Sequence, residues 1–178
     1  MLYVVALGAN IGNTRSSFAR AIELIDIQIG PVTKRSSWHI TQPVLHPECP
    51  TLGQSDFLNA AVLVESELTP PQMLQELFKI EKQLGRNRDQ EEVRWGPRVI
   101  DLDIITAEQM VILSETLTIP HPLMDSREFV LAPMVEILPD WIHPVLGRSA
   151  LELLSDLRHR QLSEAVMEKN KVANRKAG

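Results

Sequence analysis

The chain has 178 residues, of which 44% are hydrophobic and 23% are charged, and its formal net charge is −5. This length and apolar content are typical of an ordinary globular domain with a sizeable core, and the negative charge argues against a nucleic-acid-binding protein. A single cysteine, Cys49, excludes an internal disulfide, as is common for cytoplasmic proteins. The N-terminus lacks a basic region and no apolar run approaches about 18 residues, so we expect neither a signal peptide nor a membrane span.

The first third of the chain alternates strand and helix patterns. Residues 2–7 predict a buried strand, because they are apolar and partly β-branched, and residues 16–27 predict an amphipathic helix from the spacing of their apolar side chains. Residues 32–40 predict a second strand. Residues 41–54 contain three prolines and a glycine and predict a loop, whose length suggests a functional role.

A second set of elements follows this loop. Residues 57–65 predict a third strand, and Thr69-Pro-Pro begins a predicted helix that ends at Gly85. Residues 86–94 are polar and predict a surface loop, which leads into a strand that runs through Thr106. Further along, the sequence predicts four more segments: an extended segment at 117–122, a short helix capped by Asp125 or Ser126 and ending at Val135, a helical segment at 151–157, and a polar, fraying stretch at 163–178.

The order of these elements is β-α-β, β-α-β and then helices. It predicts an α+β fold with a ferredoxin-like βαββαβ antiparallel sheet, helices covering one face of that sheet, and extra C-terminal helices. No domain-scale linker or internal repeat interrupts the chain. We therefore expect a single domain over residues 1–160, followed by a frayed polar tail at 161–178.

Asp101 and Asp103 are the most informative polar pair. Side chains alternate along a strand, so both carboxylates lie on one face, while Ile100, Leu102 and Ile104 point to the other face and into the core. A rise of about 3.3 Å per residue separates the two Cα atoms by roughly 6.6 Å, which suits two hard cations bridged by carboxylate oxygens. An isolated Asp-x-Asp is also common on solvated strand faces, so the pair alone does not decide between these interpretations.

Arginines gather around this acid pair, at positions 86, 88, 94 and 98. Guanidinium groups bind phosphate in a planar, bidentate manner and stay charged near neutral pH, so a polyphosphate ligand is one interpretation. The alternative is a solvated charged loop in which Glu91 and Glu92 pair with the arginines. No Gly-x-x-x-x-Gly-Lys-Ser/Thr motif occurs, which argues against a P-loop kinase.

Two further groups are candidate ligand contacts. His121 stands between Pro120 and Pro122, a rigid frame that favours a fixed contact, although a lone histidine is often structural. Phe57 and Asn59 share a strand face and, together with Phe129, could bind a flat heterocycle through stacking and amide hydrogen bonds. Ordinary core packing is the alternative for each phenylalanine.

Residues 94–105, Arg-Trp-Gly-Pro-Arg-Val-Ile-Asp-Leu-Asp-Ile-Ile, resemble the signature of the 6-hydroxymethyl-7,8-dihydropterin pyrophosphokinase family of folate synthesis. Other segments within about residues 2–145 resemble that family in the same order: Leu7-Gly-Ala-Asn-Ile-Gly, Thr41-Gln-Pro-Val, Asp56-Phe-Leu-Asn-Ala-Ala-Val, Ile80-Glu-Lys-Gln-Leu-Gly-Arg, Ile119-Pro-His-Pro and Arg127-Glu-Phe. The loop after Val44 departs from the family by its greater length and lack of a glycine, and the loop at 89–92 by its acidic residues.

The resemblance implies transfer of pyrophosphate from ATP to the hydroxymethyl group of 6-hydroxymethyl-7,8-dihydropterin, with release of AMP. It implies that these two small molecules are the partners. The composition predicts no nucleic-acid or membrane partner and a cytoplasmic location, and nothing in the sequence demands more than a monomer. Two alternatives remain: another Mg-dependent Asp-x-Asp transferase, of nucleotidyl or glycosyl groups, and a non-catalytic ferredoxin-like ligand-binding module.

The resemblance also implies roles for individual residues. Two Mg²⁺ ions are expected on Asp101 and Asp103, and the expected catalytic residues are Arg86, Arg98 and Asp103, the last as a possible acceptor of the hydroxyl proton. The residues expected to bind ATP are Glu81, Arg88, Trp95, Arg98, His121 and Arg127. Those expected to bind the pterin are Thr41, Pro43, Val44, Phe57, Asn59, Trp95 and Phe129.

Overall fold

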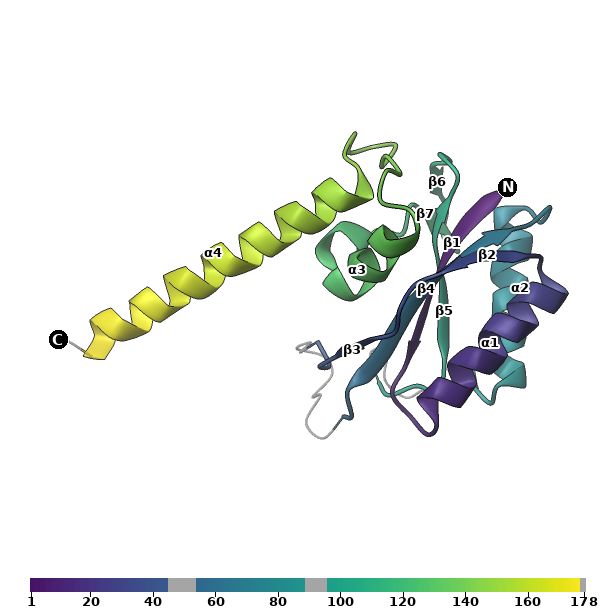
Figure 1. Cartoon of the computed structure of the whole chain (residues 1–178), viewed down its shortest axis with the longest axis horizontal. Helices are drawn as coiled ribbons and strands as arrows, with labels where there is room; N and C mark the ends of the chain where they lie inside the picture. Colours follow the sequence, from purple (N-terminus) through teal and green to yellow (C-terminus); the bar gives the residue numbers. More distant parts are fainter. Residues whose placement is uncertain (45–53, 89–95, 177–178) are drawn as a thin grey trace.

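The computed structural model describes residues 1–44, 54–88 and 96–176 (Figure 1). The strands are β1 (Leu2–Ala9), β2 (Val32–Arg35), β3 (His39–Thr41), β4 (Phe57–Glu65), β5 (Asp101–Ala107), β6 (Ile112–Leu113) and β7 (Thr118–Ile119). The helices are α1 (Thr14–Gln28), α2 (Pro70–Gln83), the 3-10 turn η2 (Met124–Ser126), α3 (Glu128–Ile137) and α4 (Ala150–Lys176).

The main sheet has the strand order β2-β4-β1-β5, and its pairings are antiparallel. Strand β3 pairs with the same neighbour as β2, further along β4. Each β-α-β unit therefore places its two strands on either side of a strand from the other unit, which confirms the predicted ferredoxin-like arrangement. The outcome is that β1 and β4, the most apolar strands, lie in the middle of the sheet.

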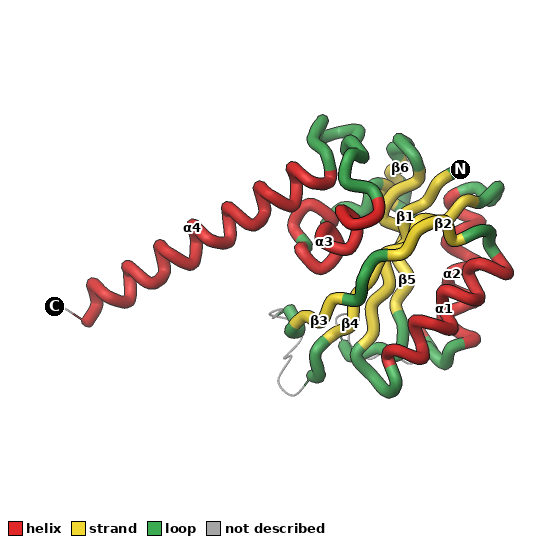
Figure 2. The backbone as a smooth tube through the Cα atoms, viewed as in Figure 1, coloured by secondary structure: helices red, strands yellow, loops and turns green. Residues whose placement is uncertain are grey.

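Helices α1 and α2 cover one face of the sheet, as Figure 2 shows. Their apolar stripes meet alternate side chains of the strands, including Leu102 and Ile104 of β5, which are buried as the alternation predicted. Asn13 caps α1 by accepting a hydrogen bond from the Ser16 backbone N–H at 3.1 Å. This layer supports the sheet from behind and leaves the carboxylates of β5 on the opposite face.

The prediction that helices cover one face was incomplete, because α3 packs on the other face and the first turns of α4 pack against α3 (Figure 2). Val130 and Met134 of α3 lie in a second core with Leu63 and Ile105 of the sheet. Helix α3 was predicted to begin at Asp125 or Ser126, but it starts at Glu128, after the 3-10 turn. Because this second core covers one end of the face, the other end is left open as a cavity.

The predicted strand over residues 32–40 is divided into β2 and β3. Ser36 causes the interruption: its hydroxyl accepts a hydrogen bond from the Ala61 backbone N–H at 2.9 Å and donates one to the Ser37 carbonyl at 2.7 Å. A serine side chain thus takes a position that a backbone carbonyl occupies in a regular ladder. The remainder of the chain from Ser37 turns toward α3 before pairing resumes at His39.

Helix α4 continues well beyond the predicted helical segment at 151–157 and projects from the body of the molecule (Figure 1). Its first turns bury Leu153, Leu154 and Leu157, whereas residues 158–170 are exposed. The boundary at residue 160 and the fraying of the tail stay predictions. Among the described residues, no helix combines the length and apolarity that crossing a membrane requires.

Candidate active site

A cavity of about 740 Å³ opens on the face of the sheet that α1 and α2 leave uncovered. Its floor is formed by neighbouring strands, because Gly8 of β1 pairs with Asn59 of β4 on one side and with Asp101 of β5 on the other. Ala6 lies next along the same face and pairs with Asp103. The two residues of the central strand are small, so polar side chains from both flanking strands reach the same space.

Most of the predicted site residues line this cavity. They are Thr41, Pro43, Val44, Phe57, Asn59, Arg98, Asp101, Asp103, His121, Arg127 and Phe129. They come from four separate parts of the chain, which only the folded sheet and α3 bring together. Three others, Glu81, Arg86 and Arg88, lie beside the cavity in one ion-pair cluster with Asp101. The predicted role of Trp95 lies outside the described residues.

Asp101 is the centre of this ion-pair cluster. One of its carboxylate oxygens accepts a hydrogen bond from Arg86, the other from Arg98, and the Arg88 guanidinium lies 3.8 Å away. Burial by itself would raise the pKa of Asp101, but the positive charges of Arg98 and Arg86 outweigh burial and hold that pKa below its ordinary value. Asp101 is therefore an ionised carboxylate whose charge is balanced by guanidinium groups.

Asp103 has the opposite electrostatic environment. Burial, followed by the negative charges of Asp101 and Glu81, raises the pKa of Asp103 to about 7. Two carboxylates on one strand face thus differ in their tendency to hold a proton, a pattern that is frequent at functional sites. A cation bound between them would favour the ionised form of both carboxylates.

Glu81 anchors the arginines from behind the cavity. Its side chain is 1% exposed, and its oxygens accept hydrogen bonds from Arg86 at 2.8 Å and from Arg88 at 2.7 and 2.9 Å. The Leu102 backbone N–H donates a further hydrogen bond at 2.8 Å, which ties Glu81 of α2 to the acidic strand. Its carboxylate faces the arginines and a backbone amide and does not line the cavity, and the predicted contact of Glu81 with ATP stays a prediction.

His121 contributes a neutral imidazole. Burial, followed by the nearby charge of Arg127, lowers its pKa to about 4. The Leu123 backbone N–H donates a hydrogen bond to its Nδ1 atom at 3.2 Å, so Nδ1 is an acceptor and the proton is on Nε2. The structure therefore provides a neutral N–H donor at the cavity, beside the guanidinium of Arg127.

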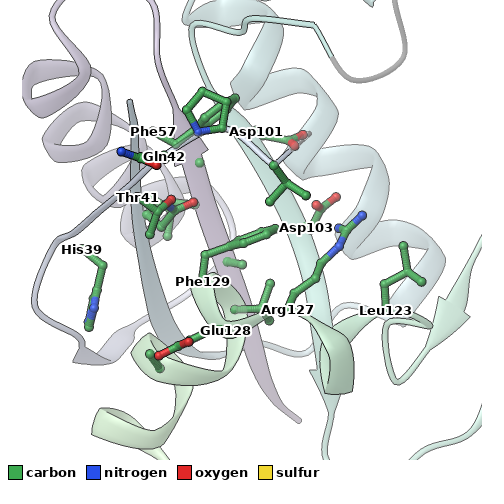
Figure 3. Close-up of a pocket in the computed structure, with 18 of the residues that line it drawn as sticks. His39, Thr41, Gln42, Phe57, Asp101, Asp103, Leu123, Arg127, Glu128 and Phe129 are labelled. Atoms are coloured by element: carbon green, nitrogen blue, oxygen red, sulfur yellow. The ribbon is translucent and has the colours of Figure 1, made fainter. Parts of the chain in front are cut away.

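The other end of the cavity has the character of a heterocycle site. Asn59 is 5% exposed, and its amide Nδ2 donates a hydrogen bond to the Thr41 hydroxyl at 2.8 Å, which fixes the orientation of the amide. In Figure 3, Phe129 lies between Thr41 on one side and Asp103 and Arg127 on the other. The Phe129 ring, the Asn59 amide and the side chains of Asp103 and Arg127 thus line the same cavity.

Asn10 is a residue of this site that the sequence reasoning missed. It is buried directly after β1, and its side-chain oxygen accepts a hydrogen bond from the Arg98 backbone N–H at 2.8 Å. Its amide nitrogen donates to the Gln54 side chain and the Ser55 carbonyl, both at 3.3 Å. Asn10 thus links Arg98 to the segment before β4. The signal was present, since a polar amide directly after a buried strand needs hydrogen-bond partners.

The family model for 7,8-dihydro-6-hydroxymethylpterin-pyrophosphokinase (HPPK) matches residues 4–139. A 2-amino-4-hydroxy-6-hydroxymethyldihydropteridine pyrophosphokinase of Synechocystis sp. is 37% identical over 155 residues, covering 86% of this chain and 75% of the relative. The protein of the same name from Bacillus subtilis is 42% identical over 134 residues, covering 75% of each chain.

Solved structures show the same fold. The crystal structure of wild-type Plasmodium falciparum HPPK-DHPS with pteroate matches with a TM-score of 0.74 at 16% sequence identity. The match covers 92% of this chain and 45% of that one, so the chain spans less than half of the length of this structure. At this identity the similarity concerns the fold.

Proposed function

This chain belongs to the 7,8-dihydro-6-hydroxymethylpterin-pyrophosphokinase family, and we propose that its cavity binds ATP at the acidic strand and the pterin at the Asn59 end. The family relation gives the chain a pyrophosphokinase activity in folate biosynthesis, with ATP as the co-substrate. It also decides against the two alternatives, a different Asp-x-Asp transferase and a non-catalytic binding module. A monomeric, cytoplasmic protein without a nucleic-acid partner stays a prediction.

One observation supports this arrangement most: Gly8 is flanked by Asn59 and Asp101 across the sheet. A heterocycle held at Asn59 would therefore have its substituent directed along the floor toward the acid pair. Asn59 and Thr41 would read the polar edge of the ring, and Phe57 and Phe129 would stack on its faces, with Pro43 and Val44 closing the rim. Holding both reactants on one rigid floor is itself a large part of such catalysis.

The acid pair fits magnesium. Asp101 and Asp103 are hard oxygen donors, and no group of three or more acidic, histidine or cysteine side chains that could hold a metal occurs among the described residues. Mg²⁺ usually binds one or two carboxylates and completes its shell with water and substrate phosphates, which suits a pair but not a closed cage. Two Mg²⁺ ions bound there would withdraw charge from the triphosphate and orient it.

Binding of the triphosphate would change the partners of the arginines. In the structure, Arg86 and Arg98 donate to the Asp101 carboxylate. We propose that they turn to phosphate oxygens when Asp101 takes a metal, so that each guanidinium always has an anionic partner. Arg88, which also contacts Glu81, would join them, and the neutral Nε2–H of His121 and the Arg127 guanidinium would hold the remaining nucleotide phosphates.

In the proposed reaction, the hydroxymethyl oxygen of the pterin forms a bond to the β-phosphorus of ATP, and the bond between that phosphorus and the α–β bridging oxygen breaks. The β- and γ-phosphates are transferred, AMP leaves, and the hydroxyl proton goes to Asp103. Arg86 and Arg98 would stabilise the charge that develops on the phosphoryl oxygens.

The test is AMP release from ATP with and without 6-hydroxymethyl-7,8-dihydropterin and with and without Mg²⁺. We expect AMP only when all three are present, and at least about a 100-fold lower rate for Asp101→Ala. Asp140→Ala, which removes an exposed acid outside the cavity, is the control and should retain the wild-type rate. AMP formation that does not depend on the pterin, or an active Asp101→Ala protein, would overturn the proposed arrangement.

A further inference from the structure

The carboxylate of Glu136, in the last turn of α3, binds the junction between β2 and β3. One oxygen accepts a hydrogen bond from the Ser37 backbone N–H at 2.6 Å, and the other accepts one from the Ser37 hydroxyl at 2.7 Å. His39 Nε2 lies 2.6 Å from that second oxygen. Although burial would raise the pKa of Glu136, these donors lower it below its ordinary value. The carboxylate form is therefore the one that the junction binds.

This contact joins the two walls of the proposed pterin site. On the strand wall, His39 pairs with Asn59 and Thr41 pairs with Phe57, so the junction leads directly into the residues that would read and stack on the ring (Figure 3). On the helix wall, Phe129 stands in the first turn of α3. It lies seven residues, or about 10 Å along the helix, before Glu136. A change at Glu136 can therefore be transmitted along a rigid helix to Phe129.

Apart from those of Glu136, directional contacts between the two walls are few among the described residues. Strand β3 has three residues and pairs only with β4 among the described strands, and short edge strands separate easily from a sheet. Helix α3 rests on the sheet through apolar residues such as Val130, Met134 and Ile137, and apolar contact is not directional. Lys34 adds one directional bond, from its Nζ to the Ile137 carbonyl at 3.0 Å. Among the described residues, Glu136 supplies the other hydrogen bonds between α3 and this junction.

From this geometry we infer that Glu136 is a positioning residue for the pterin site: through Ser37 and His39 it sets the spacing between Phe129 and the Asn59–Thr41 pair. This inference rests on the proposed function, because it assumes that the pterin lies between those walls. It affects the phosphate end of the cavity less: Arg127 there caps α3, but Arg86 and Arg88 are held by Glu81 of α2. The two ends of the site should consequently respond differently to loss of Glu136.

The experiment is to measure kcat and the KM of each substrate for Glu136→Ala. We expect the KM for the dihydropterin to rise about tenfold, as for the loss of one charge-assisted contact, while kcat and the KM for ATP stay within about twofold. Glu136→Gln keeps acceptor and donor atoms for Ser37 and should restore most of the pterin affinity. Ser37→Ala removes only the hydroxyl contact and keeps the backbone N–H and His39 contacts, so it should give a smaller rise of the same kind.

The matched control is Glu152→Ala. Glu152 of α4 also accepts hydrogen bonds from a serine, at 2.7 Å from the Ser149 backbone N–H and 2.9 Å from its hydroxyl, but it lies outside the cavity. It should leave both KM values unchanged. An unchanged pterin KM in Glu136→Ala, or equal losses for both substrates, would overturn the inference.

Measuring how tightly Phe129→Ala and Asn59→Ala bind the pterin distinguishes a failure of the Glu136 inference from a failure of the proposed function. If these two variants bind the pterin as tightly as wild type, the proposed site is wrong. If they bind it weakly while Glu136→Ala binds normally, the site is right and the positioning role of Glu136 is wrong. If Glu136→Ala does not fold, the same comparison is made with Ser37→Ala.

Discussion

Asn59 of β4 and Asp101 of β5 both pair with Gly8 of β1, which lies between these two strands. An amide and a carboxylate therefore line the same cavity from opposite sides of one central strand. With strands about 4.8 Å apart, the Cα atoms of Asn59 and Asp101 are separated by roughly 10 Å. The residues of β1 on this face, Gly8 and Ala6, are small, so no large side chain fills the cavity above the central strand. This relationship supports one cavity that holds two reactants side by side.

Enlarging Gly8 should therefore block the cavity without unfolding the protein. A Cβ atom at Gly8 would lie 3.7 Å from the Asn59 amide oxygen and 3.8 Å from the Asp101 Cβ, which is ordinary contact, so Gly8→Ala should fold and retain activity. Gly8→Val extends further into the cavity, and we expect kcat/KM to fall about 100-fold. Steady-state assays and thermal melts would check this. A Gly8→Val protein with normal kinetics would show that substrates do not use this floor.

Asp101 and Asp103 should differ in their effect on stability although both are needed for activity. Asp101→Asn leaves Arg86 and Arg98 without their shared carboxylate, so we expect lower stability together with lost Mg²⁺-dependent turnover. Asp103→Asn removes a charge that faces Asp101 and Glu81, so the metal-free protein should be as stable as wild type or more stable. The free energies of unfolding of the two variants are compared by urea denaturation in the presence of a chelator, and their activities are measured separately. Equal destabilisation by both changes would contradict this difference.

Glu81→Gln should be strongly destabilising, because the buried carboxylate holds two guanidinium groups and the Leu102 amide. We expect a loss of about 3 kcal/mol in the free energy of unfolding. Glu76→Gln on the same helix breaks only a pair with the exposed Lys79, and should cost no more than about 0.5 kcal/mol. The two variants are compared by urea denaturation at one pH. Similar small losses would mean that the buried cluster contributes little.

His121 should make the stability depend on pH between about 4 and 6.5. Its folded-state pKa is lowered to about 4, so over this range the unfolded chain binds a proton that the folded chain does not. The contribution of neutral His121 to the free energy of unfolding is thus fully present above pH 6.5 and is lost as the pH falls toward 4. His121→Asn keeps an acceptor for the Leu123 N–H without titrating, so the variant should gain on wild type as the pH falls. Unfolding free energies at pH 7 and pH 5 test this, and a constant difference would contradict it.

Removal of residues 163–178 tests whether the C-terminal stretch that was predicted to fray is dispensable for stability and activity. The described side chains from 163 to 170 are exposed, so we expect the shortened protein to retain its melting temperature and activity. Ending the chain before α4 would also remove Leu153, Leu154 and Leu157 from the second core, and this protein should fail to fold stably. Circular dichroism melts distinguish the cases. A large loss of stability from the shorter deletion would place the tail within the domain.

Local patterns in the sequence predicted much of the site. The period-two alternation of β5 placed Asp101 and Asp103 on one face and Leu102 and Ile104 in the core, as the structure confirms. The polar residue Asn59 within an apolar strand indicated a hydrogen-bond partner, which is Thr41. These predictions succeeded because side-chain direction within a strand or helix depends on the local backbone, which a short stretch of sequence determines.

Other predictions failed where contacts between residues distant in the sequence determine the local structure. The strand over residues 32–40 is interrupted because the Ser36 hydroxyl accepts a hydrogen bond from the Ala61 backbone N–H. The second helical layer on the sheet also escaped prediction, since the pattern of α3 indicates a buried face but not which sheet face it meets. Each of these depends on partners far along the chain.

By itself, the sequence determined which residues carry charge, stacking surface and hydrogen-bonding groups, and on which side of each element they lie. The tertiary structure alone decided that Gly8 stands between Asn59 and Asp101, that Glu81 neutralises the arginines, and that Glu136 reaches Ser37. The physical reason is that strand order and helix docking are set by burying apolar area between elements distant in sequence, and this requires the whole chain to fold.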